Sequence, residues 1–297
     1  MDYEECAAGL FIYLFSRETR TKLSTKKYSS IRLLETGYNS AAYNMAVDEA
    51  LMLELAASSN NHQNIVLYKE GSVEEERLQR YSSFAASAVL RIYGWKPSAV
   101  SIGYFQSLDL EVDVGECEKR GIDVIRRMTG GGAVYHDAEL TYSFLTNTFS
   151  NDIMQSYTLI CNPIVRAIRN LGFDARFVPL NDIVIGNGAK VSGNAQTRRM
   201  DMLLQHGTIL LAVDVETMFS ILKVSPEKIK DKLIDDVKKR VNGLGRSFDE
   251  VAQALKMSFS EAFDTELRSD KLTAEEYSKV QILIKEKYSS DSWNRRR

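Results

Sequence analysis

A run of three glycines between two stretches of strand character most strongly limits how this chain can fold. The strand-like residues 122–125 precede the triplet at 130–132, and the alternating run 140–145 follows it. Glycine tolerates positive φ and carries no side chain, so the segment can present backbone N–H groups to a ligand. Arg126 and Arg127 stand at its entrance. Guanidinium groups pair with the oxygens of phosphates and carboxylates, so the combination predicts a binding site for one of these anions. A glycine hairpin with solvated arginines is the competing interpretation.

A second glycine turn lies further along the chain. Gly186-Asn187-Gly188 marks a tight hairpin, so residues 182–185 and 190–195 should pair as antiparallel strands. Lys190 then lies at the start of the second strand, where its ammonium group can neutralise a phosphate or an attacking carboxylate. An ordinary exposed strand lysine is the competing interpretation of this residue alone.

Together these stretches resemble the lipoate–protein ligase family. Four linked motifs carry the resemblance, and their order and spacing fit as well: residues 126–137, Asn181-Asp182-Ile183, residues 190–195 and His206-Gly207-Thr208. The family's pattern also appears at residues 44–50 and 101–106. Four linked motifs are far more specific than one glycine-rich loop. The resemblance extends from about residue 31 to the end of the chain.

The resemblance implies an α/β (α+β) fold of the biotin and lipoate ligase type, with a mixed, largely antiparallel sheet flanked by helices. Residues 1–30 are then an N-terminal arm or linker, and residues 31–297 the catalytic domain. Residues 58–87 depart from the family as a surface insertion, and residues 215–297 are expected to form a helical tail. The chain stops where longer ligases continue into an accessory domain, which is typical of the shorter, split type.

Hydrophobic periodicity and capping signals predict the individual elements. Helices are expected at residues 43–57, 112–120, 156–171, 215–222 and 226–238, and after the capping-box sequences that begin at Ser247 and Thr273. Further strands are expected at residues 31–35, 65–68, 88–93, 99–103 and 203–213. Asp48 and Glu49 are interpreted as solvated helix carboxylates, and Cys117 and Cys161 as packing residues.

Composition excludes several classes of protein. The chain of 297 residues is 44% apolar, enough for a sizeable core, and its net charge of −2 gives no reason to expect nucleic-acid binding. Three cysteines without metal-ligand spacing favour a reducing, cytoplasmic location. No stretch approaches the roughly 20 apolar residues of a membrane-spanning helix, so no membrane association is expected.

The resemblance implies a two-step reaction. Lipoic acid attacks the α-phosphate of ATP, with Mg²⁺ as cofactor, and a lysine of an acceptor protein then attacks the resulting lipoyl-AMP. Lys190 is the implied catalytic residue, because it can bridge the lipoyl carbonyl and the phosphate. The implied ATP and lipoyl-AMP contacts are Arg127, Gly131, Gly132, Ala133, Val134, Tyr135, Asn181, Asp182 and Lys190. The implied lipoate-pocket or secondary residues are Arg126, Gly103, His136, Asp137, Ser192, Gly193, His206 and Thr208. Asp182 is also a candidate Mg²⁺ ligand, although Asn181 and Asp182 could instead act through the acceptor lysine.

The implied partners are the lipoyl domains of 2-oxoacid dehydrogenase E2 subunits, the glycine cleavage H protein and a separate accessory ligase subunit. The alternative is a lipoyl or octanoyl transferase that moves the acyl group between carrier proteins without ATP. Some such enzymes use a cysteine nucleophile near the lysine motif. No cysteine lies between Asn181 and His206, which disfavours that reaction. A lipoyl-binding protein without turnover and a biotin ligase are weaker alternatives.

Overall fold

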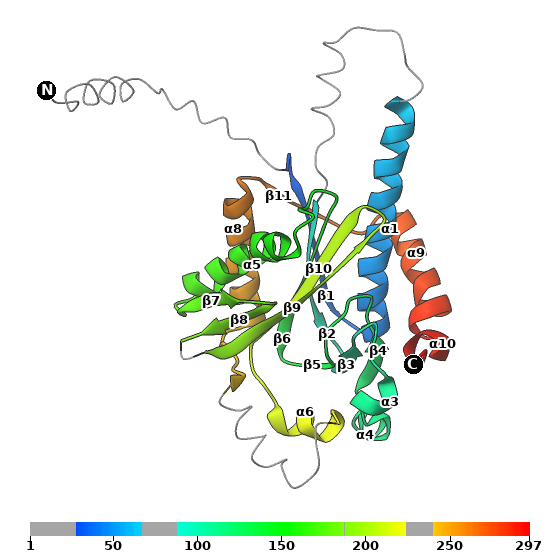
Figure 1. Cartoon of the computed structure of the whole chain (residues 1–297), viewed down its shortest axis with the longest axis vertical. Helices are drawn as coiled ribbons and strands as arrows, with labels where there is room; N and C mark the ends of the chain where they lie inside the picture. Colours follow the sequence, from blue (N-terminus) through cyan, green and yellow to red (C-terminus); the bar gives the residue numbers. More distant parts are fainter. Residues whose placement is uncertain (1–27, 67–87, 187, 224–239) are drawn as a thin grey trace, which may run out of the picture.

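The computed structural model describes residues 28–66, 88–186, 188–223 and 240–297 (Figure 1). Its large sheet has eight strands. In spatial order they are β11 (Leu267–Asp270), β1 (Ile31–Asn39), β2 (Ala88–Trp95), β6 (Glu139–Thr146), β10 (Met202–Leu210), β9 (Ala189–Arg199), β8 (Asp182–Ile185) and β7 (Ala175–Val178). The pairs β11–β1 and β1–β2 are parallel, and the remaining neighbours are antiparallel. The expected mixed, largely antiparallel sheet is therefore confirmed.

A small second sheet holds the glycine loop. Its strand β3 (Ala99–Ile102) pairs in parallel with β4 (Asp123–Arg126) and antiparallel with β5 (Val134–His136). The glycine triplet lies in the connection between β4 and β5, where Gly131 has a φ of 94°. Both ends of the loop are thus fixed to one strand, β3. A Cβ atom added to Gly103 would lie 2.0 Å from the carbonyl oxygen of Gly131, so only glycine allows the loop to approach β3 this closely.

Helices cover both faces of the large sheet (Figure 1). On one face, α5 (Ile153–Asn170) and α8 (Phe248–Phe263) pack on Leu90, Tyr142 and Phe144. On the other, α1 (Ala41–Val66) packs on Val89 and Leu145 and is flanked by α9 (Ala274–Leu283). Because helices cover both faces of the sheet, every residue of β2 and β6 is buried. Neighbouring residues of these strands therefore pack into the hydrophobic cores on opposite faces of the sheet. The remaining helices are α3 (Leu108–Glu111), α4 (Val114–Arg120), α6 (Val215–Ile221), α10 (Asp291–Asn294) and the π-helical segment Ile284–Tyr288.

Most of the predicted elements are present, and both capping boxes, at Ser247 and Thr273, are formed. Three expectations need correction. Residues 215–297 are not purely helical, because the short strand β11 joins the sheet edge beside β1. Ile65 and Val66 continue α1 instead of starting a strand. The carboxylate of Asp48 on the first helix is buried and not solvated, as described below. The arm at residues 1–27, the rest of the insertion at 67–87 and the helix expected at 226–238 lie outside the described residues.

Candidate active site

The glycine loop and the second glycine hairpin meet at a cavity of about 320 Å³. Volumes of roughly 300–1,000 Å³ are typical of small-molecule sites. Of the residues predicted from the sequence, the cavity is lined by Arg127, Gly131, Gly132, Ala133, Val134, Tyr135, His136, Asp137, Asn181, Lys190, Gly193, His206 and Thr208. Apolar parts of the cavity lining come from Met45, Trp95, Leu210 and Met218. The cavity therefore combines an apolar surface with the predicted polar groups.

Four predicted residues do not line this cavity. Arg126 is fully buried elsewhere and donates to the carbonyl oxygens of Gly103, Tyr104 and Gln106 and of Trp293 and Asn294. It therefore ties the segment after β3 to α10. The other three are Gly103, which lies against the glycine loop, Asp182, which contacts Lys190, and the fully buried Ser192.

Arg127 holds the glycine loop in shape through contacts with its backbone. Its Nη2 donates to the carbonyl oxygens of Gly130 and Gly132 at 2.8 and 2.7 Å, and its Nε donates to Thr129 Oγ1 at 3.1 Å. Its Nη1 donates to the carbonyl oxygen and Oγ of Ser101 at 2.9 and 3.1 Å. Burial lowers the pKa of Arg127 to about 10. Its donors are engaged by the protein, so the observed role of Arg127 is to fix the shape of the glycine loop.

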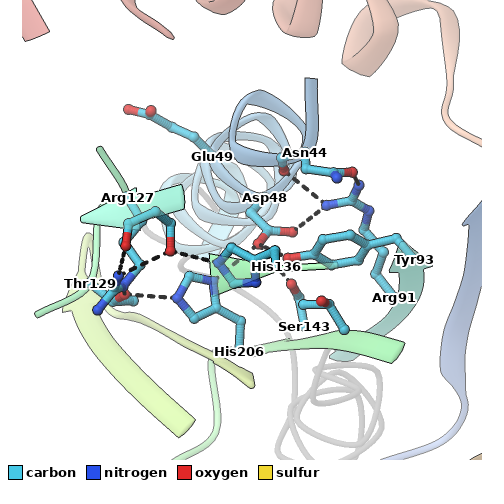
Figure 2. A network of polar contacts seen from close by, with 12 residues as sticks. Asn44, Asp48, Glu49, Arg91, Tyr93, Arg127, Thr129, His136, Ser143 and His206 are labelled. Carbon is cyan, nitrogen blue, oxygen red and sulfur yellow. Dashed lines mark hydrogen bonds and ion pairs between the residues drawn. The ribbon is translucent and has the colours of Figure 1, made fainter. Parts of the chain in front are cut away.

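Asp48 corrects the interpretation of the first helix. It is fully buried, and its Oδ1 accepts a hydrogen bond from Arg91 Nη1 at 2.8 Å, while Ser143 Oγ donates to its Oδ2 at 2.7 Å (Figure 2). Asn44 accepts two further bonds from Arg91. Burial by itself raises the pKa of Asp48, but the attraction of Arg91 and the hydrogen bonds outweigh it and leave this pKa below its usual value. Glu49 is half-buried and bonded to Lys287 and Tyr288.

His206 joins Asp48 to the glycine loop. Its Nδ1 lies 3.5 Å from Asp48 Oδ2, and its Nε2 lies 2.7 Å from Thr129 Oγ1. A carboxylate can only accept, so Nδ1 carries the proton and Nε2 accepts from the threonine hydroxyl. Burial lowers the pKa of His206, which keeps the ring neutral near pH 7.

Lys190 is the half-exposed cation of the cavity wall. Its Nζ lies 2.8 Å from Asp182 Oδ1, across the pair of strands β8 and β9. A Cβ atom at Gly193 would lie 3.1–3.2 Å from the end of the Lys190 side chain, so glycine at this position leaves room for the ammonium group. The motif that runs from Asp182 to Gly193 thus builds one feature, a lysine held by a carboxylate at the edge of the cavity.

Neither described cysteine lines the cavity. Cys117 packs in a small cluster under β3, and Cys161 packs between α5 and the large sheet, as predicted. Burial raises the pKa of Cys117 to about 11 and that of Cys161 to about 12. Both are therefore protonated, weak nucleophiles at neutral pH. Cys6 lies outside the described residues.

Sequence reasoning missed several polar or aromatic residues of the cavity, among them Ser101, Glu139 and Trp95. Ser101 belongs to a segment that carried the family pattern, but its partner, His136, lies 35 positions away in the sequence. Glu139 is three residues after His136, a spacing that could have suggested the contact. Trp95 stacks on the His136 ring with a centroid separation of 4.0 Å, which only the fold reveals.

A family model of the lipoyl protein ligase A/B catalytic domain matches residues 40–263. Octanoyltransferase LipM of Kyrpidia tusciae is 34% identical, over 90% of this chain and 98% of the relative. The same enzyme of Geobacillus kaustophilus is 32% identical, with the same coverage. A solved structure of a bi-partite lipoate protein ligase from Thermoplasma acidophilum has a TM-score of 0.74 and 32% identity, over 90% of this chain and 96% of that one.

These matches define an enzyme of the lipoate ligase and transferase class. The chain belongs to the lipoyl protein ligase A/B catalytic domain family.

The curated relatives correct the expected reaction. They are octanoyltransferases, so the expected ATP-dependent lipoate ligase, with ATP and Mg²⁺ as cofactors, is wrong. A transferase receives an acyl group that is already activated, and therefore has no adenylation step. The shared motifs misled because both reactions need positive charge and N–H donors beside an acyl carbonyl. These relatives also give no support to a separate accessory subunit. Within the described residues, no helix is both long and apolar enough to span a membrane.

Proposed function

We propose that this enzyme transfers an octanoyl or lipoyl group from an activated donor to a lysine of a lipoyl-domain protein, without ATP. The observation that carries the proposal is the cavity itself, whose lining combines apolar side chains with Lys190 and the glycine loop. Similarity to octanoyltransferases over 90% of the chain supports the reaction type. A thioester of a carrier protein is the donor that fits best, because thioesters react readily with amines and leave a stable thiolate.

The polar end of the cavity suits the charge that develops in acyl transfer. When a nucleophile adds to the acyl carbonyl, its oxygen becomes negative, and fixed donors aimed at that oxygen lower the barrier. Lys190 supplies a positive charge at this end. In the described part of the chain, the N–H groups of Gly131, Gly132 and Ala133 have no hydrogen-bond partner. They are therefore free to bind the oxyanion.

The apolar wall suits the other end of the substrate. Met45, Leu210 and Met218 come from α1, β10 and α6, so the acyl chain would be enclosed by three separate elements. Burial of apolar surface contributes about 25 cal/mol per Å², which favours a medium-length acyl chain over acetate. Methionine side chains adapt to irregular shapes, so both a straight octanoyl chain and a lipoyl ring would be accommodated.

The test is transfer from an octanoyl thioester of acyl carrier protein to an apo lipoyl domain in the absence of ATP, followed by the intact mass of the acceptor. The wild-type chain should acylate the acceptor, and Lys190→Ala should lower kcat by about 100-fold or more, because an oxyanion contact is lost. Lys190→Arg keeps the charge and should retain part of the activity. An unchanged rate in Lys190→Ala would remove this residue from the mechanism.

A further inference from the structure

Covalent acyl transfer needs a nucleophile, and neither described cysteine supplies one. At the cavity, the Ser101 hydroxyl is a potential nucleophile with a histidine base in contact with it. Ser101 Oγ lies 2.7 Å from His136 Nε2, and His136 Nδ1 lies 2.7 Å from Glu139 Oε1. All three residues line the cavity. This sequence of contacts, nucleophile to base to orienting carboxylate, is the arrangement that activates serine in hydrolases and acyltransferases.

The hydrogen-bond partners settle which atom holds each proton. Glu139 Oε1 can only accept, so His136 Nδ1 carries a proton and Nε2 is free to accept from the Ser101 hydroxyl. Arg127 Nη1 donates to Ser101 Oγ from another side at 3.1 Å. The Ser101 hydroxyl therefore donates its hydrogen bond to His136, while its oxygen accepts one from the buried, positively charged Arg127. Both interactions favour the alkoxide character that attack on an acyl carbonyl requires.

The surroundings hold His136 in place. Trp95 stacks on its ring, and Trp95 Nε1 donates to Thr141 Oγ1, which in turn donates to Glu139 Oε1 at 2.7 Å. In the described part of the chain, the second oxygen of Glu139 is buried without a hydrogen-bond partner. A buried carboxylate with unused acceptor capacity would stabilise the imidazolium that forms when His136 takes up a proton.

The similar chain of contacts through His206 does not form a second nucleophile. Thr129 is fully buried and does not line the cavity, and the contact between His206 and Asp48 is long, at 3.5 Å. The two histidines thus differ in a way that can be tested. Both histidines line the cavity, but the hydroxyl that contacts His206 belongs to the buried Thr129, whereas the hydroxyl that contacts His136 belongs to Ser101, which itself lines the cavity.

We propose that Ser101 is the acyl-accepting nucleophile, with His136 as general base and acid and Glu139 as the group that orients it. The proposal rests on the proposed acyl-transfer function. Ser101 Oγ attacks the thioester carbonyl as His136 Nε2 takes its proton, and the C–S bond then breaks as this proton passes to the departing thiolate. The acceptor lysine, as a neutral amine, next attacks the Ser101 ester. Its proton returns through His136 to Ser101, giving the amide and free enzyme.

The experiment that tests this inference traps the intermediate. The full chain is mixed with octanoyl acyl carrier protein without acceptor, quenched in acid, and analysed by intact mass and peptide mapping. We expect one octanoyl group on Ser101, stable to neutral hydroxylamine as an oxygen ester. Ser101→Cys should form the corresponding thioester, which hydroxylamine removes. This change of chemistry at an unchanged site is a result that a merely structural serine would not give.

Rates provide the second readout. Ser101→Ala should lower kcat for ATP-free transfer by about 100-fold or more, and Glu139→Gln should lower kcat with little change in KM. Ser292→Ala, which changes an exposed serine of α10, is the matched control and should keep wild-type activity. The urea midpoint of each variant shows whether it folds. If Ser101→Ala does not fold, Ser101→Cys still tests the proposal, because it keeps a nucleophile of similar size at the same position.

Three results would overturn the inference. Octanoylation of Cys6 would identify a different nucleophile. Transfer by folded Ser101→Ala within about threefold of wild type, with no trapped ester, would indicate direct attack of the acceptor lysine on the thioester; the proposed function would then stand without Ser101. Absence of any ATP-free transfer by the wild-type chain would instead remove the proposed function, and this inference with it.

Discussion

At the scale of single residues, the two neighbouring arginines show what sequence can and cannot predict. Arg126 and Arg127 look equivalent beside the glycine run, yet successive side chains of a strand point to opposite sides. Arg127 therefore reaches the loop and the cavity wall, while Arg126 binds the carbonyl oxygens of α10 and of the segment after β3. Sequence located the loop correctly, but only the direction of each side chain assigns the roles.

Asp48 illustrates the same limit. A carboxylate on an amphipathic helix usually faces solvent, and the residue that buries it here, Arg91, lies 43 positions away on β2. A long-range partner of this kind leaves no local signal. The cost of removing one member of such a pair is large, because the other charge stays buried without compensation.

We therefore expect Asp48→Ala to lower the free energy of unfolding by about 3–5 kcal/mol. Urea denaturation of the variant and of wild type measures the difference. Asp109→Ala is the control, because Asp109 is exposed and its ion pair with Arg295 spans 3.6 Å; a change within about 0.5 kcal/mol is expected there. Equal effects of the two substitutions would mean that the buried pair does not contribute as its geometry implies.

The buried His206 makes stability depend on pH. Its pKa is lowered in the folded protein, so below about 6.5, the usual pKa of histidine, the unfolded chain binds the proton first. The contribution of His206 to the free energy of unfolding should therefore be constant well above this pH and decrease as the pH falls through about 6.5. Urea midpoints at several pH values, for wild type and His206→Gln, measure this slope. The slope should be smaller in the variant; the same slope in both would assign it to other groups.

At the scale of elements, local signals predicted helices well and the sheet edge poorly. The capping boxes at Ser247 and Thr273 involve residues three positions apart, so the sequence contains the whole interaction. By contrast β11 is four mostly exposed residues, Leu267–Asp270, and becomes a strand because β1 offers an open edge. Its sequence has little strand character of its own, and the contact that orders it spans more than 200 residues.

Ser247 provides the prediction at this scale. Its side chain accepts from the Glu250 N–H at the start of α8, a helix that covers one face of the large sheet. Ser247→Ala should lower the free energy of unfolding by about 0.5–2 kcal/mol. Ser107 occupies the same position before α3 but makes no capping hydrogen bond. Ser107→Ala should therefore have a smaller effect, as measured by thermal or urea unfolding, and a reversed order would contradict the capping argument.

At the scale of the whole molecule, the scaffold was predictable and the reaction was not. The sheet, the glycine loop and Lys190 follow from linked motifs, and similar proteins of near-equal identity include both octanoyltransferases and a lipoate protein ligase. The fold therefore provides a cavity whose lining combines apolar side chains with Lys190 and the glycine loop. Which activated acyl group a cavity of this kind accepts depends on the few groups that contact the reacting atoms. The candidate groups are not adjacent in the sequence: the pairing of β3 with β5 brings Ser101 to His136, and Glu139 follows three residues later at the start of β6.

The most direct test compares two acyl sources for one preparation of the enzyme. Initial rates of lipoyl-domain acylation, read from intact mass, are measured with octanoyl acyl carrier protein alone and with free octanoate plus ATP and Mg²⁺. We predict rapid acylation from the thioester, unchanged by removal of ATP, and at most slight acylation from the free acid. Acylation only from the free acid, with strict dependence on ATP, would contradict the assignment as a transferase.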